Sequence, residues 1–142
     1  MDIEFNPTPI KTSIKLLAVL KQLITNKCTE VNISYITIHS RDSKYNYKEG
    51  GYHPVEIVLQ KDAVTGRWDI LYITDFSYSG YLYIDLIINL DFDFSLGTFS
   101  AVYCSPRPIT DQDTEEVYQL WQSNFLCYVD SGAFDQIEVS AS

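Results

Sequence analysis

The first strong periodic signal in the chain predicts an amphipathic helix that begins after Thr12 or Ser13. At about 100° per residue, its apolar positions fall on one broad stripe, while lysines and other polar residues fall on the opposite side. The hydroxyl of Thr12 or Ser13 can cap this helix by accepting a bond from an unpaired backbone N–H. The stripe comprises Leu16, Leu17, Val19, Leu20, Leu23 and Ile24. One face of the helix is therefore expected to be buried, and the other, basic face to be exposed.

The middle of the chain predicts β-strands joined by short turns. β-branched residues favour a strand over residues 31–39, and a second strand is expected over residues 53–60, where Pro54 marks its start or an edge of the sheet. A third strand, over residues 67–76, forms an antiparallel hairpin with the second. On this third strand, Trp68, Ile70, Tyr72 and Phe76 are expected to share one face.

Residues 77–90 are apolar nearly throughout, so periodicity does not separate a buried strand from a short helix. We expect a strand to start near Tyr81 and leave open a helical turn over residues 85–90. A further strand is predicted over residues 98–104, ended by the prolines that follow it.

A second amphipathic helix is predicted to start at Thr110, with Asp113 in the place of the usual glutamate of a capping box. Acidic residues in its first turn suit the positive end of the helix dipole. Its apolar face comprises Val117, Tyr118, Trp121, Phe125, Tyr128 and Val129, and Gln119 and Gln122 are expected on the exposed face. A short strand or tail over residues 136–139 completes the chain.

This order of elements predicts an α+β protein with a single domain over residues 1–142. Successive strands with short turns form an antiparallel β-meander, and one face of such a sheet has to be covered. We expect the N-terminal and the C-terminal amphipathic helix to cover that face.

Charge is divided unevenly along the chain. Residues 1–67 carry nine basic and seven acidic side chains, whereas residues 68–142 carry one base, Arg107, and twelve acids, which together give the net charge of −9. Such a division favours surfaces that attract each other, within one molecule or between copies. The acidic balance argues against direct binding of nucleic acid, because phosphates would be repelled.

The remaining composition is that of a globular protein, with 46% hydrophobic and 20% charged residues. Cys28, Cys104 and Cys127 lie far apart and form no CxxC pair, so neither zinc nor disulfides are indicated and a reducing compartment is expected. The start of the chain resembles neither a signal peptide nor a membrane span. We therefore expect a cytoplasmic protein with no membrane partner. We also expect no cofactor.

No pattern identifies a catalytic residue or a metal ligand. Asp91 and Asp93 have the D-x-D spacing of many metal sites, but the segment fails the calcium-loop pattern, and a half-buried strand explains its alternation. No serine lies in a G-x-S-x-G turn, and no cysteine neighbours a histidine in sequence.

Four residues are candidates for binding: Tyr52, His53, Glu56 and Asp75. Asp75 lies in a strongly apolar hairpin, where a carboxylate needs hydrogen-bond partners or a raised pKa. His53 follows two glycines, and Glu56 lies three residues further on. Since residues three apart on a strand point to opposite faces, a pair between His53 and Glu56 would need a bulge.

Four segments that span most of the chain carry a family resemblance. They are residues 50–56 (GGYHPVE), 72–78 (YITDFSY), 90–95 (LDFDFS) with Gly97, and 118–121 (YQLW) with Asn124 and Phe125. Together they resemble a small bacterial family known as domain of unknown function 2787. The resemblance implies a fold similar to the mitochondrial matrix acidic glycoproteins, which include the complement globular-head-binding protein. Those proteins have a twisted antiparallel sheet, terminal helices on one side and ring-shaped trimers. The resemblance assigns no activity and no catalytic residue.

Charge and aromatic content favour a non-enzymatic acidic binding or scaffold protein that acts as a homo-oligomer and has a basic protein partner. One alternative is an acidic mimic of nucleic acid that inhibits a DNA-binding protein. The other alternative is an enzyme of unknown reaction that uses Asp75, His53 and Glu56 in a cleft beside the two glycines.

Overall fold

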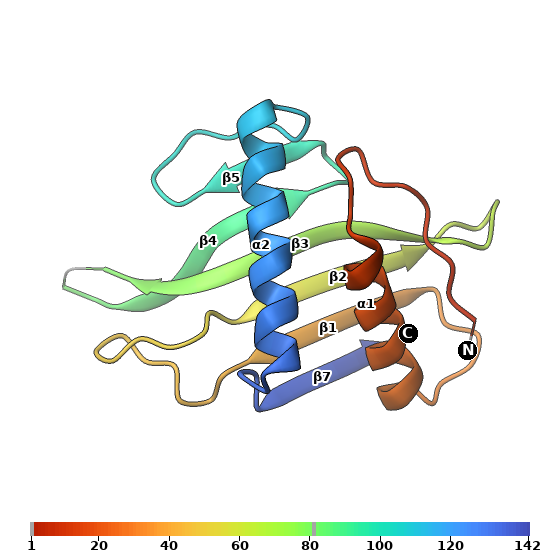
Figure 1. Cartoon of the computed structure of the whole chain (residues 1–142), viewed down its shortest axis with the longest axis horizontal. Helices are drawn as coiled ribbons and strands as arrows, with labels where there is room; N and C mark the ends of the chain where they lie inside the picture. The colour runs from red at the N-terminus through yellow and green to blue at the C-terminus, as the bar shows by residue number, and fades with distance from the viewer. Residues whose placement is uncertain (1, 81) are drawn as a thin grey trace.

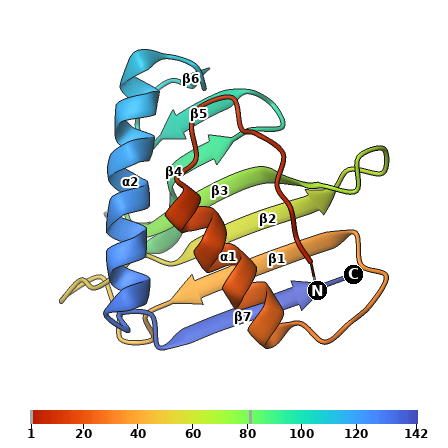
Figure 2. The same ribbon diagram turned by 45° about the vertical axis from the view of Figure 1, so that its right-hand side comes forward.

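The computed structural model describes residues 2–80 and 82–142, which form one antiparallel sheet and two helices (Figure 1). The strand order is β6-β5-β4-β3-β2-β1-β7. Both helices lie on the same face of the sheet, as the two views in Figures 1 and 2 show. The elements are α1 (Ile14–Lys27), β1 (Tyr35–Arg41), β2 (Val55–Lys61), β3 (Trp68–Ser79), β4 (Asp85–Asp93), β5 (Thr98–Ala101), β6 (Arg107–Pro108), α2 (Gln112–Asp130) and β7 (Gln136–Ala141).

The α+β class and the antiparallel sheet predicted from the sequence are confirmed. Strands β1 to β6 are neighbours in chain order, whereas β7, which follows α2, returns to pair with β1. The short strand or tail predicted over residues 136–139 is therefore a strand. The helical turn left open over residues 85–90 is wrong, because this segment is β4 and pairs with β3 up to Ser79. Tyr81, where a strand was expected to start, lies outside the described residues.

Both helices bury the apolar stripes that the sequence predicts, but their ends differ. In α1, Ser13 is the N-cap and its side chain accepts a bond from the N–H of Lys15. In α2 the N-cap is Asp111, with no side-chain cap bond, so the predicted capping box at Thr110 does not form. The acidic first turn of α2 is therefore stabilised by the helix dipole rather than by a reciprocal pair of side-chain bonds.

The two helices meet through neutral hydrogen bonds. The side chain of Gln122, which the sequence placed on the exposed face of α2, is buried at 1% exposure. Its Oε1 accepts from the N–H of Ser13 at 2.6 Å, and its Nε2 donates to the carbonyl of Lys11 at 3.3 Å. Gln119 donates to the same carbonyl at 3.0 Å. These bonds satisfy backbone groups at the start of α1, where no intrahelical partner exists.

Two β-bulges set which way the side chains of β3 and β4 point. Leu71 is an extra residue opposite the Val58–Leu59 step of β2, and Asn89 is an extra residue opposite the Asp75–Phe76 step of β3. A bulge reverses the alternation that follows it. Ile73 and Asp75 therefore join Trp68 and Ile70 on the side covered by the helices. The prediction that Tyr72 and Phe76 share the face of Trp68 is wrong, because both lie beyond the bulge at Leu71.

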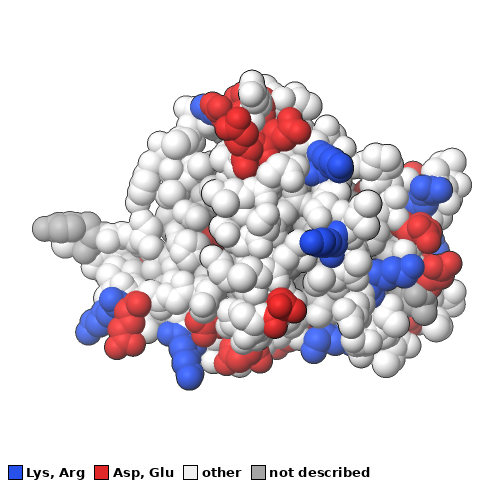
Figure 3. Space-filling view, viewed as in Figure 1, with Lys and Arg blue, Asp and Glu red and all other residues white. Residues whose placement is uncertain are grey.

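The basic and the acidic part of the sequence contribute strands to the same sheet. β1 and β2, from the basic part, lie together between β3 and β7, which come from the acidic part. On the face in Figure 3, acidic side chains gather over the start of α2, and a mixed group of acids and bases lies at the opposite edge. Among the described residues, no lysine or arginine before β3 forms a salt bridge with an acid beyond it.

The core under α2 is centred on Phe92, which is 0% exposed. Its ring lies 4.9 Å from those of Phe99 and Tyr118 and 6.1 Å from that of Trp121, measured between centroids. This aromatic cluster joins α2 to β4 and β5, so the position of the helix depends on it.

Replacing Phe92 by alanine should lower the free energy of unfolding by about 3–5 kcal/mol, because it removes buried apolar surface and leaves a cavity. Leu96→Ala, at a turn where the side chain is 76% exposed, is the control and should change stability by less than about 0.5 kcal/mol. Urea unfolding followed by circular dichroism measures both. Equal losses in the two variants would contradict this description of the core.

Candidate functional site

A cavity of about 260 Å³ lies between α2 and the underlying sheet, where Val55 of β2, Asp75 of β3 and Leu90 of β4 line it. Its walls are mostly apolar, and the other lining residues come from α2, from the loop before β2 and from the segment after α2. The aromatic residues that line it are Tyr52, Trp121, Phe125, Tyr128 and Phe134. His53 and Asp75 are the lining residues that carry a formal charge, and both are candidates predicted from the sequence.

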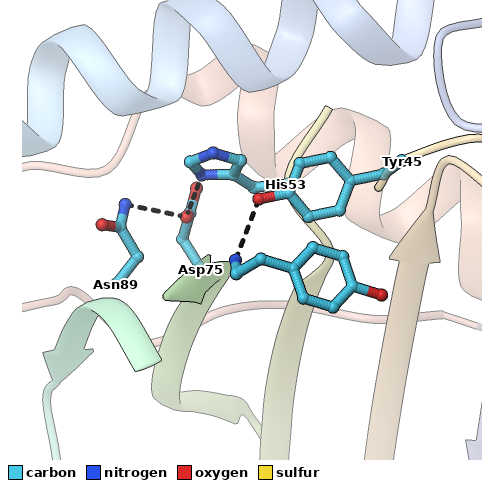
Figure 4. A network of polar contacts seen from close by, with 5 residues as sticks. Tyr45, His53, Asp75 and Asn89 are labelled. Atoms are coloured by element: carbon cyan, nitrogen blue, oxygen red, sulfur yellow. Dashed lines mark hydrogen bonds and ion pairs between the residues drawn. The ribbon is translucent and has the colours of Figure 1, made fainter. Parts of the chain in front are cut away.

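The carboxylate of Asp75 is held by two side chains, shown in Figure 4. Its Oδ1 lies 2.8 Å from Nδ1 of His53 and accepts a bond of 3.1 Å from Nδ2 of Asn89. Asp75 is only 8% exposed. A carboxylate on the helix-covered side of a sheet is stable only with such partners, because burial without them costs several kcal/mol. The bulge at Asn89 brings this amide to the same side of the sheet.

His53 is held in place by an aromatic contact as well. The ring of Tyr45 lies 5.4 Å from the imidazole and stacks on Tyr78 at 5.0 Å, measured between centroids. The hydroxyl of Tyr45 accepts a bond of 3.1 Å from the N–H of Tyr78, which is also drawn in Figure 4. The loop before β2 is thereby fixed to the end of β3. This contact orients the imidazole so that one nitrogen faces Asp75.

Tyr52 reaches the cavity because the preceding backbone makes a close turn. Gly51 has φ +136°, and a Cβ there would lie 2.9 Å from Oδ2 of Asp42 and 3.0 Å from Cα of Tyr45. Only glycine fits this approach without displacing the loop. The ring of Tyr52 then packs edge-on against that of Tyr128, at 4.7 Å between centroids.

Glu56, the fourth candidate, lies on the opposite face of the sheet. Its Oε1 lies 3.2 Å from Nε2 of His39 on the neighbouring strand β1. Burial, together with the nearby carboxylate of Glu56, raises the pKa of Tyr72 to about 12. The structure thus brings Tyr52, His53 and Asp75 together at one cavity and places Glu56 elsewhere, as the strand alternation requires.

The sequence did not point to Asn89 or to the part that α2 plays in the cavity. Asn89 is in an apolar run whose bulge is set by pairing with β3, so no local signal marks it. The sequence did place Trp121 and Tyr128 on the apolar, buried face of α2. That apolar periodicity was the one signal in the sequence for their position. What could not be foreseen is that this face leaves a cavity above Asp75.

The chemistry that this arrangement supports is binding or proton transfer. A His–Asp pair can serve as a general base, but no serine, cysteine or lysine is among the residues that line the cavity. Within the described residues, no group of three or more His, Cys, Asp or Glu is placed to hold a metal ion. Of the D-x-D pair, Asp91 accepts a bond from Thr74, and Asp93 accepts bonds from the Ser95 hydroxyl and the Leu96 N–H at the next turn.

A second surface feature is the end of the β3–β4 hairpin, which extends beyond the body of the sheet in Figure 1. Its large apolar side chains are 38–85% exposed. We call this surface the apolar arm and define it by Tyr78, Leu82, Tyr83, Ile84, Leu86 and Ile88. Isolated exposed apolar residues are common, but monomeric proteins rarely expose large contiguous apolar patches.

A family model described as "Protein of unknown function (DUF2787)" matches residues 14–140. The chain belongs to the DUF2787 family. The resemblance noted in the sequence is therefore confirmed, and the match spans every helix and almost all of the sheet. Comparison with curated proteins finds no match.

Two solved structures from Vibrio cholerae are similar to this DUF2787 protein over nearly its whole length. The hypothetical protein VC0508, from the VSP-II pathogenicity island, has 38% identity and a TM-score of 0.93, covering 99% of this chain and 100% of its own. The conserved hypothetical protein VC1805, from pathogenicity island VPI-2, has 40% identity and a TM-score of 0.85, covering 96% and 99%. VC1805 is described as sharing structural homology with the human P32 protein.

The likeness of VC1805 to human P32, a protein of the mitochondrial matrix acidic glycoprotein type, agrees with the fold expected from the sequence. It assigns no activity. Within the described part of the DUF2787 chain, no helix has both the length and the apolar character that crossing a membrane requires.

The His53–Asp75 bond should make stability depend on pH. The bond to Asp75 raises the pKa of His53, against the opposing effect of burial. The folded protein therefore holds this proton more tightly than the unfolded chain does. The resulting stabilisation is fully present below about pH 6.5 and is lost as the pH rises through the folded pKa.

In Asp75→Asn, the pKa of His53 measured by NMR should fall, and the corresponding slope of unfolding free energy against pH should flatten. Glu56→Gln is the matched control, since it removes one carboxylate on the other face of the sheet, and it should leave the pKa of His53 unchanged. A His53 pKa that stays the same in Asp75→Asn would show that the bond does not exist in solution.

Proposed function

We propose that this DUF2787 protein is a non-enzymatic binding protein that acts through protein–protein contacts as a homo-oligomer. The observation that supports the proposal is the apolar arm, in which Leu82 and Tyr83 are 82% and 85% exposed. Leaving such side chains in water costs about 25 cal/mol for each Å² of apolar surface that a partner could cover. A second copy of the chain is the partner we propose for this surface.

Charge supports a second copy at this place. Each copy carries a net charge of −9, so most contacts between two copies bring like charges together. The arm is an exception, because Asp85 is the single charged residue between Phe76 and Leu90. Contact there buries apolar surface with little repulsion. A basic partner, which the net charge also favours, would instead seek acidic surface such as that over the start of α2.

The backbone of the arm supports the same contact. β5 pairs with β4 over Leu90–Asp93, and the N–H of Val102 donates to the carbonyl of Asn89. Residues 85–88 of β4 therefore keep one edge without a strand partner among the described residues. Such an edge can pair with the same edge of a second copy about a two-fold axis, which makes a closed, self-complementary contact.

Leu86→Asp combined with Ile88→Asp should dissociate the assembly, because the new carboxylates would face each other across the contact. We expect the dissociation constant to rise by about tenfold or more, measured by sedimentation velocity over a range of concentrations. The wild-type assembly should persist at high salt, since salt screens repulsion between acidic copies.

Val64→Asp is the matched control, because Val64 is 94% exposed at the turn after β2, away from the arm. It should leave the assembly intact. A wild-type protein that stays monomeric at every concentration would contradict the proposal, as would a Val64→Asp variant that dissociates as readily as the arm variant.

A further inference from the structure

The cavity above Asp75 has a chemical character that selects one kind of ligand. Its walls are largely aromatic and aliphatic, with His53 and Asn124 as polar side chains, and one carboxylate, that of Asp75, lies at its floor. His53 and Asn89 both bond to the same oxygen of this carboxylate, Oδ1. Among the described residues, none donates a hydrogen bond to the other oxygen, Oδ2. This oxygen is not fully enclosed by the protein. One carboxylate oxygen is therefore free to meet a ligand.

We propose that this cavity binds an organic cation, a primary ammonium or guanidinium group carried on an apolar stem, with the cationic group on Oδ2 of Asp75. The stem would lie against Trp121, which is 7% exposed, and against Val117 of α2. Aromatic rings such as Tyr52 and Tyr128 add a favourable interaction with a cation held near their faces. No residue of the apolar arm lines this cavity, so the site does not depend on self-association.

The charges around the cavity favour a cation over an anion. α2 contributes no charged side chain to the lining, and β2 contributes Val55. β4 contributes the apolar Leu90, while the neutral amide of Asn89 bonds to Asp75. The preceding loop supplies Tyr45, Tyr52 and His53, with Asp42 close behind Gly51. For the Asp75–His53 pair that lines the cavity, the charge is thus negative when His53 is neutral and zero when it is protonated. The net charge of −9 adds a long-range field of the same sign.

Binding of a cation should therefore compete with the proton on His53. When His53 is protonated, its charge is matched to Asp75 and repels an incoming cation. When it is neutral, the carboxylate is available. Affinity for a cation should rise with pH through the pKa of His53, whereas an anion bound to the imidazolium would show the opposite trend.

The test uses two probes with the same ring and opposite charge, 2-phenylethylamine and 3-phenylpropionate, titrated into the full chain and followed by NMR. Near pH 8, we expect the amine to bind at least about tenfold more tightly than the carboxylate, and to weaken as the pH is lowered to about 6. Tighter binding of 3-phenylpropionate, or amine affinity that rises on acidification, would overturn the proposal.

Two variants locate the site. Asp75→Asn should weaken amine binding about tenfold, while Glu56→Gln, which changes the net charge equally on the other face of the sheet, should leave it within about twofold. Equal loss in both variants would overturn the proposal in favour of a general charge effect. Should Asp75→Asn fail to fold, Val117→Phe fills the cavity without changing any charge. Amine binding that survives in Val117→Phe would place the ligand elsewhere and overturn the proposal.

The cation can come from a free amine or from a basic side chain of a protein. A short blocked peptide with one arginine, compared with the same peptide containing citrulline, distinguishes the two sources. Binding of the arginine peptide supports the site and assigns it to a protein partner. Binding of 2-phenylethylamine without the arginine peptide supports the site and assigns it to a free amine.

Discussion

The buried carboxylate of Asp75 is the constraint around which the irregular parts of this fold are arranged. It lies on the helix-covered side of the sheet, where an ionised group needs hydrogen-bond donors. His53 comes from the loop before β2, and Asn89 comes from a bulge in β4. The loop reaches this position through the close approach at Gly51 and the Tyr45–Tyr78 contact. Three separate segments are thus fixed by one charge.

The position of α2 explains why this charge faces a cavity and not a packed core. The helix is anchored where Tyr118 and Trp121 pack against Phe92 of β4. Further along, its aromatic side chains pack against the loops on either side, including Tyr52 and Phe134. Between these two contacts the helix spans Asp75 without filling the space above it. The same cluster that stabilises the protein therefore shapes the opening.

The sequence predicted those elements whose signal is local. The apolar stripe of each helix, the β2–β3 hairpin and the α+β class follow from periodicity and turn residues, and Asp75 was marked by its apolar surroundings. What failed depended on partners distant in sequence. Alternation placed Tyr72 on the wrong face, because the bulge at Leu71 is set by pairing with β2. Gln122 was expected in water, yet it is buried because Ser13 and Lys11 supply its partners. The uneven charge along the chain gave no sign that β7, from the acidic part, would pair with β1, from the basic part.

The apolar arm and the cavity suggest two separate contacts for a DUF2787 protein, one with a second copy and one with a cation. The most direct test of the buried charge as a binding site for a cation is the pKa of His53, measured by NMR with and without saturating 2-phenylethylamine. Because linkage between two bound species is reciprocal, a cation on Asp75 must lower that pKa if the two compete. A clear fall is the expected result. A pKa that stays the same or rises would contradict a cation site at Asp75.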